Sequence, residues 1–380
     1  MFKQVKQLAA LLCIICLLFS GCSQAPYVEG AGIDNNNKSL EVSKFALPSS
    51  SNLRTYIDIY KSQILYMEIN KNVAEFYIYD ISTKTKTKIK TIKNFALKGK
   101  SNILLNNKLY FYISIYGDPD LKNQLYAVDF TKKSMEYISE NSYSQKLIPM
   151  ARIGDNIFAL QGILNNKTKI TQTFIENYDF NTSSKKAKKF LEKSIATNDS
   201  SVSNSARQFL YIDGDHDYLY AIEKGFTKGK AQYFLTKYDK NKKLINESFF
   251  NNIFTENNIT DNVGLFYAFN DYFCIIDYSN NALIGKIESG KLKVLLCDTN
   301  LDYVVNYLDS RYEFFYRRQT NEIYMLDKEK GVIKKQTYEL DNSSSDIRCV
   351  LSYGDKLLVV KAPKDNIKNE KFYFIDKFYD

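Results

Sequence analysis

One stretch of the chain has the sequence Leu125-Tyr126-Ala127-Val128-Asp129-Phe130-Thr131-Lys132, an apolar and aromatic run that ends in an acid and a polar turn. An earlier stretch, Tyr77-Ile78-Tyr79-Asp80-Ile81-Ser82-Thr83-Lys84, repeats this pattern. Aromatic and β-branched residues favour strands, so each stretch is predicted to be a strand followed by a tight turn. The acid recurs along the chain at spacings of 49, 50, 60, 49, 39 and 49 residues. It stands at Asp80, Asp129, Asp179, Asp239, Glu288, Asp327 and Asp376.

A second series of polar turns repeats with the same period. Each turn separates two apolar runs, and from Ile64 to Leu357 the series covers 293 residues in six intervals, about 49 per repeat. The turns lie at residues 60–64, 106–109, 154–157, 214–218, 270–272, 310–312 and 354–357. Each unit therefore holds four short strands, in the second unit at about 102–105, 108–115, 124–130 and 134–140. Four strands in about 40–50 residues are typical of a propeller blade.

These two series predict an all-β fold, a β-propeller of seven four-stranded blades, with six blades and an extra sheet as the alternative. The pattern of strand, aromatic residue, acid and Thr/Lys/Gly turn resembles the bacterial YWTD-like and related repeat β-propellers. The resemblance covers residues 52–380. It implies a binding scaffold, because the known members are mostly that, and it transfers no individual residue.

The seventh unit stops just after Asp376, one strand short of the others. An open ring would leave two unpaired strand edges. Residues 39–47 include the strand-like side chains of Leu40, Val42, Phe45 and Leu47 and have no unit of their own. We therefore expect residues 39–47 to supply the missing outer strand beside about residues 371–377 and to close the ring.

The amino terminus has the features of a secretory signal. Lys3 and Lys6 precede a 12-residue apolar run, which is shorter than the about 20 residues that a bilayer-spanning helix needs. The run ends in Leu18-Phe19-Ser20-Gly21-Cys22, which resembles the lipobox of bacterial lipoprotein precursors, with Phe19 at the position of the usual Leu. This resemblance implies that residues 1–21 are cleaved and that the Cys22 sulfur carries a diacylglyceryl group.

Acyl chains on Cys22 would anchor the protein at the extracytoplasmic face of the cell membrane, since each buried CH₂ contributes about 0.8 kcal/mol. Residues 22–38 are then expected to form a tether and residues 39–380 the propeller. Cleavage removes Lys3 and Lys6 and lowers the net charge from +9 to +7. Most of this charge is lysine, which suits anionic lipids or wall polymers better than nucleic acid, because nucleic-acid readers rely on Arg.

Three cysteines remain after cleavage, Cys274, Cys297 and Cys349. Each lies in a strand-like run, and Cys274 and Cys297 are expected two strands apart, roughly 10 Å. A disulfide needs Cα atoms within about 7 Å. All three are therefore predicted to be free thiols that act as small buried hydrophobic side chains.

The connections define two faces of the ring. With the strands of a blade named A to D from the axis outward, the A–B and C–D turns lie on one face, which we call the turn face. The B–C and D–A connections lie on the opposite face, the loop face. The turns are short and uniform, whereas the loops are long and uneven, as at residues 117–120, 193–205 and 251–262. Because function usually resides on irregular loops of a rigid scaffold, we expect ligands on the loop face, near the channel mouth.

Four loop-face residues are the candidates for ligand binding. Asp118 and Asp120 lie in one B–C loop, and Arg317 and Arg318 lie in another. Lysines also repeat on outer strands, at residues 84–90 and 185–189. There they would block edge-to-edge association of sheets, or form a patch for an anionic polymer.

The chain lacks the motifs of familiar catalytic and metal sites. His216 is the only histidine and falls in an A–B hairpin without a nucleophile motif. The surrounding acidic turn has Tyr218 and Lys224 where an EF-hand loop needs Gly and Glu. The absence of Trp and the scarcity of Arg disfavour a sialidase-like propeller. No zinc-ligand cluster and no phosphate-binding loop is present in the sequence.

The sequence therefore predicts a surface-tethered, non-enzymatic propeller that binds a protein or a cell-envelope component and needs no cofactor. An extracellular hydrolase with loop carboxylates is one alternative. A solute-binding lipoprotein that feeds a transporter is another, although two-lobed α/β folds are usual for that role.

Overall fold

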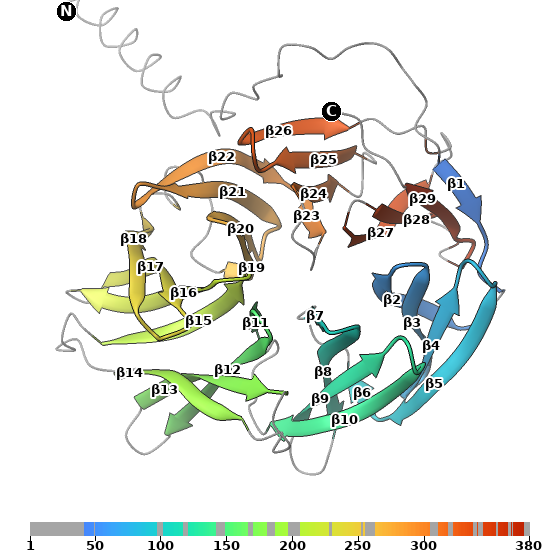
Figure 1. Cartoon of the computed structure of the whole chain (residues 1–380), viewed down its shortest axis with the longest axis horizontal. Helices are drawn as coiled ribbons and strands as arrows, with labels where there is room; N and C mark the ends of the chain where they lie inside the picture. The colour runs from blue at the N-terminus through green and yellow to red at the C-terminus, as the bar shows by residue number, and fades with distance from the viewer. Residues whose placement is uncertain are drawn as a thin grey trace, which may run out of the picture.

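The chain folds into seven antiparallel sheets that surround a central axis as the blades of a propeller (Figure 1). Each blade has four main strands. The prediction of a seven-bladed all-β propeller is confirmed, and the six-blade alternative is wrong. The computed structural model describes residues 42–48, 50–96, 102–116, 121–141, 149–165, 170–180, 187–196, 206–227, 230–251, 254, 263–304, 311–317, 322–336, 340, 345–354, 356–363, 366 and 368–375.

The first four blades follow one another along the chain, each in the order A, B, C, D. Blade 1 contains β2 (Leu53–Tyr60), β3 (Gln63–Asn70), β4 (Val73–Asp80) and β5 (Thr85–Lys93). Blade 2 contains β7 (Asn102–Leu105), β8 (Lys108–Tyr116), β9 (Leu121–Asp129) and β10 (Ser134–Asn141). Blade 3 contains β11 (Met150–Ile153), β12 (Asn156–Asn165), β13 (Ile170–Asp179) and β14 (Lys188–Ala196). Blade 4 contains β15 (Arg207–Gly214), β16 (Tyr218–Thr227), β17 (Lys230–Asp239) and β18 (Leu244–Phe249).

Three further blades complete the ring. Blade 5 contains β19 (Val263–Phe269), β20 (Tyr272–Asp277), β21 (Asn281–Glu288) and β22 (Lys291–Thr299). Blade 6 contains β23 (Leu301–Val304), β24 (Tyr312–Arg317), β25 (Glu322–Asp327) and β26 (Val332–Gln336). Blade 7 contains β27 (Ser345–Tyr353), β28 (Lys356–Pro363), β29 (Lys371–Ile375) and, as its outer strand, β1 (Val42–Phe45).

Two details of the strands differ from the sequence prediction. β14 extends to Ala196, which pairs with Ile170, so residues 193–196 are in a strand and not in the predicted D–A loop. The reason is that Ile195 is buried, and the strand continues until this last apolar side chain is covered. Blade 2 also gains a short additional strand, β6 (Phe95–Ala96), which pairs with β8.

β1 closes the ring between the two ends of the chain. It pairs antiparallel with β29, with Val42 opposite Ile375 and Phe45 opposite Phe372 (Figure 1). The rings of Phe45 and Phe372 lie 5.2 Å apart, and Leu47 is buried between blades 7 and 1. The predicted closure by residues 39–47 is confirmed for Val42–Phe45, whereas residues 39–41 lie outside the described part of the chain.

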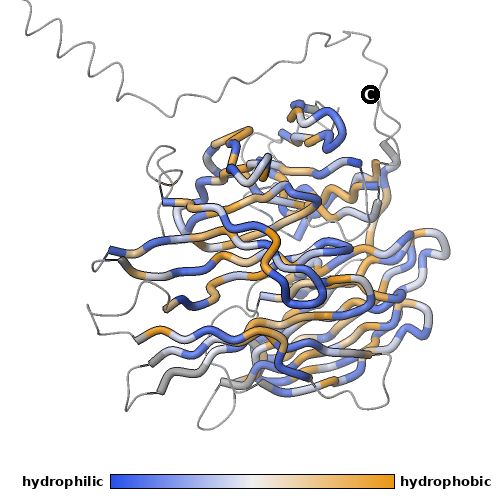
Figure 2. Tube along the Cα trace, turned by 60° about the vertical axis from the view of Figure 1, so that its left-hand side comes forward, coloured by the Kyte–Doolittle hydropathy of each residue, from blue (hydrophilic) through white to orange (hydrophobic). Residues whose placement is uncertain are grey.

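The hydrophobic core is divided into layers, because one cluster of buried side chains lies between each pair of neighbouring blades. Successive side chains of a strand point to opposite faces of its sheet. In β3, Leu65 and Met67 pack toward blade 2, and Ile64 and Tyr66 pack toward blade 7. Inner strands therefore need apolar residues at consecutive positions. Figure 2 shows these hydrophobic runs, interrupted by hydrophilic positions.

The recurring acid at the end of strand C holds the C–D turn. Oδ1 of Asp80 accepts hydrogen bonds from the backbone N–H groups of Ser82, at 3.0 Å, and Thr83, at 3.3 Å. Aspartate is suited to this role because its short side chain reaches the backbone two residues on. Glu288 precedes a shorter turn of two residues. The aspartates that bond two N–H groups of their own turns in the same way are Asp129, Asp239 and Asp327.

The three cysteines of the propeller are free thiols, as predicted. Cys274 in β20 and Cys297 in β22 are separated by β21, so they lie two strands apart. Cys274 and Cys349 are buried, whereas Cys297 is only partly buried. The prediction of burial is therefore wrong for Cys297, because it lies on an outer strand with no further strand beside it.

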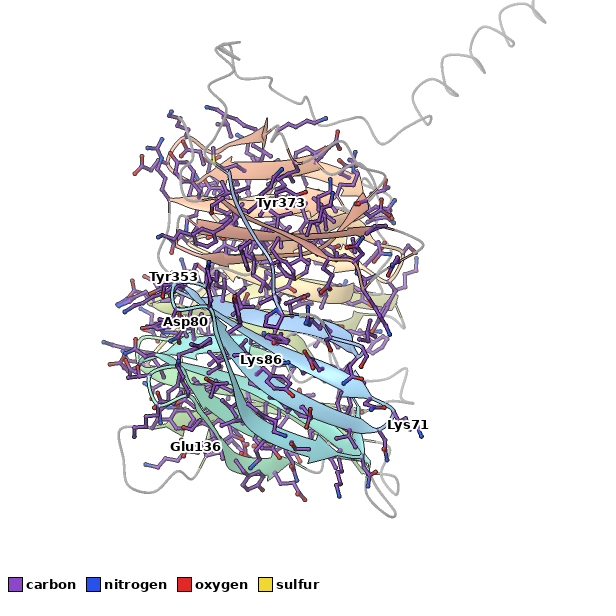
Figure 3. The ribbon with its side chains drawn as sticks, turned by 90° about the vertical axis from the view of Figure 1, so that its right-hand side faces the viewer. Lys71, Asp80, Lys86, Glu136, Tyr353 and Tyr373 are labelled. Carbon is purple, nitrogen blue, oxygen red and sulfur yellow. The ribbon has the colours of Figure 1, made fainter. Side chains whose placement is uncertain are left out.

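The two faces of the ring are separated by the length of the strands. Figure 3 views the ring from its edge, with Asp80 and Tyr353 near the turn face and Lys71 near the loop face. Turn-face connections are short except those between β13 and β14 and between β23 and β24, while on the loop face Asn300 alone joins β22 to β23. Within the described residues, no helix has the length and apolar character needed to span a membrane.

Deletion of residues 23–47 should destabilise the propeller, because it removes β1 and exposes the edge of β29. Burial of Leu47 contributes about 1.5–3 kcal/mol and the half-buried Phe45 adds less, so we expect a loss of about 2–5 kcal/mol. Thermal unfolding would measure it. Deletion of residues 23–38 alone is the matched control and should leave the melting temperature unchanged. Equal melting temperatures for both deletions would contradict the closure.

Candidate functional site

Of the residues proposed for the site, the structure describes Arg317. Cys22, Asp118, Asp120 and Arg318 lie outside the described residues. Arg317 is the last residue of β24, at the loop face as expected. It is held by two acids: its Nη1 donates to Glu322 Oε2 at 2.8 Å, and its Nη2 pairs with Asp298. A ligand of Arg317 would therefore compete with two carboxylates.

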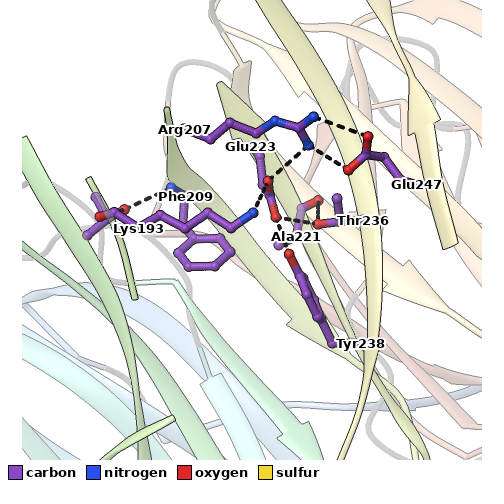
Figure 4. A network of polar contacts seen from close by, with 9 residues as sticks. Lys193, Arg207, Phe209, Ala221, Glu223, Thr236, Tyr238 and Glu247 are labelled. Carbon is purple, nitrogen blue, oxygen red and sulfur yellow. Dashed lines mark hydrogen bonds and ion pairs between the residues drawn. The ribbon is translucent and has the colours of Figure 1, made fainter. Parts of the chain in front are cut away.

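A larger network of polar contacts lies at the loop face between blades 3 and 4 (Figure 4). Its centre is Glu223 of β16, whose side chain is fully buried. Glu223 Oε2 pairs with Lys193 Nζ of blade 3 and, at 3.5 Å, with Arg207 Nη1. Glu223 Oε1 accepts hydrogen bonds from the hydroxyl groups of Thr236, at 2.9 Å, and Tyr238. The carboxylate is thus surrounded by donors from two blades.

Arg207 extends this network outward. Its guanidinium makes a two-pronged contact with Glu247, with Nη1–Oε2 and Nη2–Oε1 distances of 2.6 and 3.1 Å. It also lies 3.6 Å above the centre of the Phe234 ring. A planar guanidinium can stack and bind a carboxylate at the same time, which an ammonium group cannot do.

The seam between blades 7 and 1 has a similar set of charges. Arg54 of β2 pairs with Glu68 of β3 at 3.4 Å and with Glu370 of blade 7 at 3.5 Å, and these three side chains are almost completely buried. The Tyr56 hydroxyl donates to Glu370 Oε2. Lys86 Nζ of β5 pairs with Glu68 at 2.8 Å and lies 3.9 Å from the centre of the Tyr77 ring.

These contacts share one geometry. Lys193–Glu223 joins blades 3 and 4, Arg54–Glu370 joins blades 7 and 1, and Arg317–Asp298 joins blades 5 and 6. Each therefore links neighbouring blades at the loop face. Removing one partner of a buried pair is costly because the other charge remains buried. Lys193, Arg54 and Arg317 are basic side chains of the kind that bind anions, but here they form structural bridges between blades.

An open hollow of about 450 Å³ lies on the loop face at blade 1. Its walls come from the ends of β3 and β4 and the turn between them, so rigid strands hold them. A small recess beside it contains Arg54 and Glu370 of the seam, and Asn52 contributes to both. The lining includes carboxylates, amides and an ammonium group together with the apolar stems of these side chains. The residues that line the hollow are Asn52, Glu68, Asn70, Lys71, Asn72, Val73 and Glu75.

Among the described acids, Asp213, near the turn-face end of β15, has the most strongly shifted pKa. Burial raises the pKa of its carboxyl to about 8, with a smaller contribution from Asp215 and Glu313, although hydrogen bonds from the backbone oppose the rise. Its oxygens accept the N–H groups of Gly214, at 2.8 Å, and Ala268, at 2.9 Å. Since Ala268 belongs to β19, the side chain ties the inner strands of blades 4 and 5 together.

Among the described residues, the groups best suited to nucleophilic catalysis, His216 and Cys274, belong to different blades. His216 lies in the A–B turn of blade 4, largely exposed, with Nδ1 3.1 Å from Asp217 Oδ1. Cys274 is completely buried, and burial raises the pKa of its thiol, which keeps it protonated. Among the described residues, no group of three or more His, Cys, Asp or Glu side chains is arranged to hold a metal ion.

Two lysines of β5 are also engaged within the blade. Lys88 Nζ pairs with Glu75 at 2.9 Å, as Lys86 does with Glu68. Both lysines thus face acids of the inner strands in blade 1. This arrangement satisfies the alternating charge of the outer strand without a ligand.

Sequence reasoning missed Glu223 and Glu68, although they leave a signal. Each is a single acid inside an apolar run of strand B, Ala221-Ile222-Glu223 and Tyr66-Met67-Glu68. A charge at such a position is buried and must be paired. Its partners are distant in sequence, so the signal identifies the acid but not the arginine or lysine that faces it.

Comparison with known proteins agrees with this fold. No protein-family model matches the chain. No curated protein matches it either. Several solved structures do resemble it.

The β-propeller domain of the Trilobed protease from Pyrococcus furiosus is 19% identical, with 74% of this chain and 82% of that chain covered and a TM-score of 0.46. An uncharacterised protein from Listeria monocytogenes is 12% identical, with coverages of 83% and 90% and a TM-score of 0.46. An acylaminoacyl peptidase is 11% identical with a TM-score of 0.50, and 85% of this chain matches 51% of the peptidase chain. At this identity, the likeness to the peptidase shows the propeller fold alone.

Substitution Glu223→Gln should destabilise the protein by about 3 kcal/mol, because Lys193 and Arg207 lose the charge that neutralises them in a buried site. Urea-induced unfolding would measure this loss. The matched control is Glu192→Gln, which breaks the exposed Lys189–Glu192 pair and should change stability little. Equal unfolding midpoints for the two variants would show that the Glu223 network does not hold the blades together.

Proposed function

We propose that the protein is a lipid-anchored propeller at the extracytoplasmic face of the cell membrane, that it is not an enzyme, and that its loop face binds a protein or a cell-envelope component. We further propose kinship with the YWTD-like repeat propellers. The lipobox-like end of the signal at Cys22 supports the anchor. The anchor and the ring would together make a stationary binding platform.

The observation that carries the binding proposal is the hollow at blade 1. Its volume of about 450 Å³ lies within the range of about 300–1,000 Å³ that is usual for ligand sites. Most of its lining residues are polar in type, although apolar atoms form the larger part of its exposed lining, and strand ends form its walls. Hydroxyl, amide or amine groups of a glycan or a peptide segment are the chemistry that such a lining would recognise.

The charged networks support a scaffold role for the rest of the face. Arg54, Arg207 and Arg317 each contact two carboxylates, so they hold blades in place. Lys71, at the tip of the β3–β4 turn, is exposed and lines the hollow. Recognition is therefore assigned to the hollow and to the loops around it.

Substitution Cys22→Ala removes the sulfur that would carry the lipid. We expect the variant either to leave the membrane fraction or to remain as an uncleaved precursor. Metabolic labelling with a fatty acid, followed by detergent partitioning, would measure both. A variant that is still acylated and processed as the wild type would contradict the anchor at Cys22.

Two matched variants of blade 1 test binding at the loop face. Lys71 and Lys61 are exposed lysines in two-residue turns with φ of 55° and 54°, but only Lys71 is on the loop face. Lys71→Glu should lower the amount of envelope component captured in a pull-down about ten-fold, equivalent to about 1.4 kcal/mol. Lys61→Glu should capture as much as the wild type. Loss of capture with Lys61→Glu, but not with Lys71→Glu, would place binding on the turn face and contradict the proposal.

A further inference from the structure

The direction of β1 determines where the preceding chain joins the ring. β29 is a C strand, which runs from the loop face at Lys371 to the turn face at Ile375. β1 is antiparallel to it, and Val42 pairs with Ile375. Residues before Val42 therefore join the ring at the turn face, on the outer edge of blade 7. Cys22, the acylated residue of the proposed function, is twenty residues along the chain from this point.

The outer rim of the turn face is rich in lysine. The described residues of the C–D turns include eight lysines and one acid, Glu329. These lysines come from blades 1, 2, 4 and 6, and six of them are exposed, whereas Lys328 is nearly buried against Glu313. Blades 1 and 6 flank blade 7, so the lysines lie on both sides of the point where the chain enters. The eight are Lys84, Lys132, Lys133, Lys240, Lys242, Lys243, Lys328 and Lys330.

The conformation of the turns fixes several of these side chains. Lys84, Lys133 and Lys242 have φ of 55°, 50° and 70°, in the left-handed region that glycine and asparagine occupy with less strain. The aspartates that hold the turns accept backbone hydrogen bonds, as Asp80 does from Ser82 and Thr83. The lysines are therefore presented by ordered turns.

Positive charge on this face is concentrated at the rim, since the described A–B turns hold two basic residues, Lys61 and Arg311, against four acids. The A–B turns, which lie nearer the axis, carry acids that are paired with local donors or exposed. A flat anionic surface would meet the rim lysines at the outer edge, where the chain from Cys22 also arrives. The acids of the described A–B turns are Asp155, Asp215, Asp217 and Asp271.

We propose that the rim lysines of the turn face rest on the anionic lipid headgroups of the membrane and leave the loop face pointing away from it. This inference rests on the proposed function, because the lipid on Cys22 would bring the rim to the bilayer. Each lysine near an anionic bilayer strengthens binding about five-fold. Several rim lysines together would hold the tethered propeller in one orientation relative to the membrane.

Vesicle binding by the chain that begins at Ser23 tests the contact without the acyl group, and this chain retains every described residue of the closed ring. Vesicles contain three parts phosphatidylcholine to one part phosphatidylglycerol, or phosphatidylcholine alone. Wild-type protein should sediment with the anionic vesicles only, and high salt should release it. Removal of three rim lysines should weaken partitioning by more than about ten-fold. The rim variant combines Lys84→Gln, Lys132→Gln and Lys330→Gln.

A loop-face variant with the same change of net charge is the control and should bind as the wild type does. Equal loss of binding in both variants would overturn the proposal, because charge alone would then explain it. Equally tight, lysine-dependent binding of inorganic polyphosphate in solution would also overturn it, in favour of a soluble polyanion as the partner. The control combines Lys93→Gln, Lys230→Gln and Lys371→Gln, three exposed lysines of the loop face outside the hollow.

Orientation has its own readout. In vesicles that contain a nitroxide-labelled lipid, a fluorophore on Thr83→Cys should be quenched, and one on Asn72→Cys should not, both in a Cys297→Ser background. Equal quenching at the two positions would overturn the orientation. Because the chain used in these assays lacks the acyl group, their failure would leave the anchor at Cys22 intact. Conversely, loss of the anchor would not affect vesicle binding by the rim.

Discussion

The burial of both faces of every blade is the constraint on which the rest of this structure depends. Alternate side chains of each inner strand pack against different neighbours, as Leu65 and Ile64 of β3 do. An open seam would expose one whole cluster and two strand edges. β1 removes that edge with four residue pairs to β29, and Leu47 extends the contact into the cluster between blades 7 and 1. The first and last parts of the ring therefore hold each other.

Charged side chains reinforce the blade interfaces where apolar layers reach the loop face. Buried ion pairs offset their desolvation only when the geometry is good and other donors are present. Glu223 meets this condition through Lys193, Arg207 and two hydroxyl groups. At the closing seam, Glu370 has Arg54 and Tyr56 as partners. Such bridges fix the position of one blade relative to the next.

The fold was predictable because its signals are local and repeated. The aspartate at the end of strand C bonds its own turn, so the same residue type must return once per blade, as Asp80 and Asp129 do. Closure was predictable because the seventh unit lacked an outer strand and the strand-like residues 39–47 belonged to no unit. The extension of β14 was not, since it depends on the burial of Ile195 in the folded ring.

Much of the candidate site depends on contacts between residues far apart in the sequence. Tyr56 and Glu370 are 314 residues apart, and neither position is marked by a local motif. Arg317 was correctly placed at the loop face, but its pairing with Asp298 of the preceding blade requires the ring geometry. The hollow likewise combines Asn52, which follows the closing strand, with the β3–β4 turn. Local sequence patterns therefore predict the blades, whereas the contacts between blades follow only from the assembled ring.

Closure of the ring by β1 is the central claim, because it also determines the face at which the chain from Cys22 arrives. Native-state hydrogen exchange of the amides in Val42–Phe45 tests it most directly. We expect these amides to be protected and to exchange together with those of β29, in the same cooperative opening. Rapid exchange of Val42–Phe45 while β29 remains protected would contradict the closure.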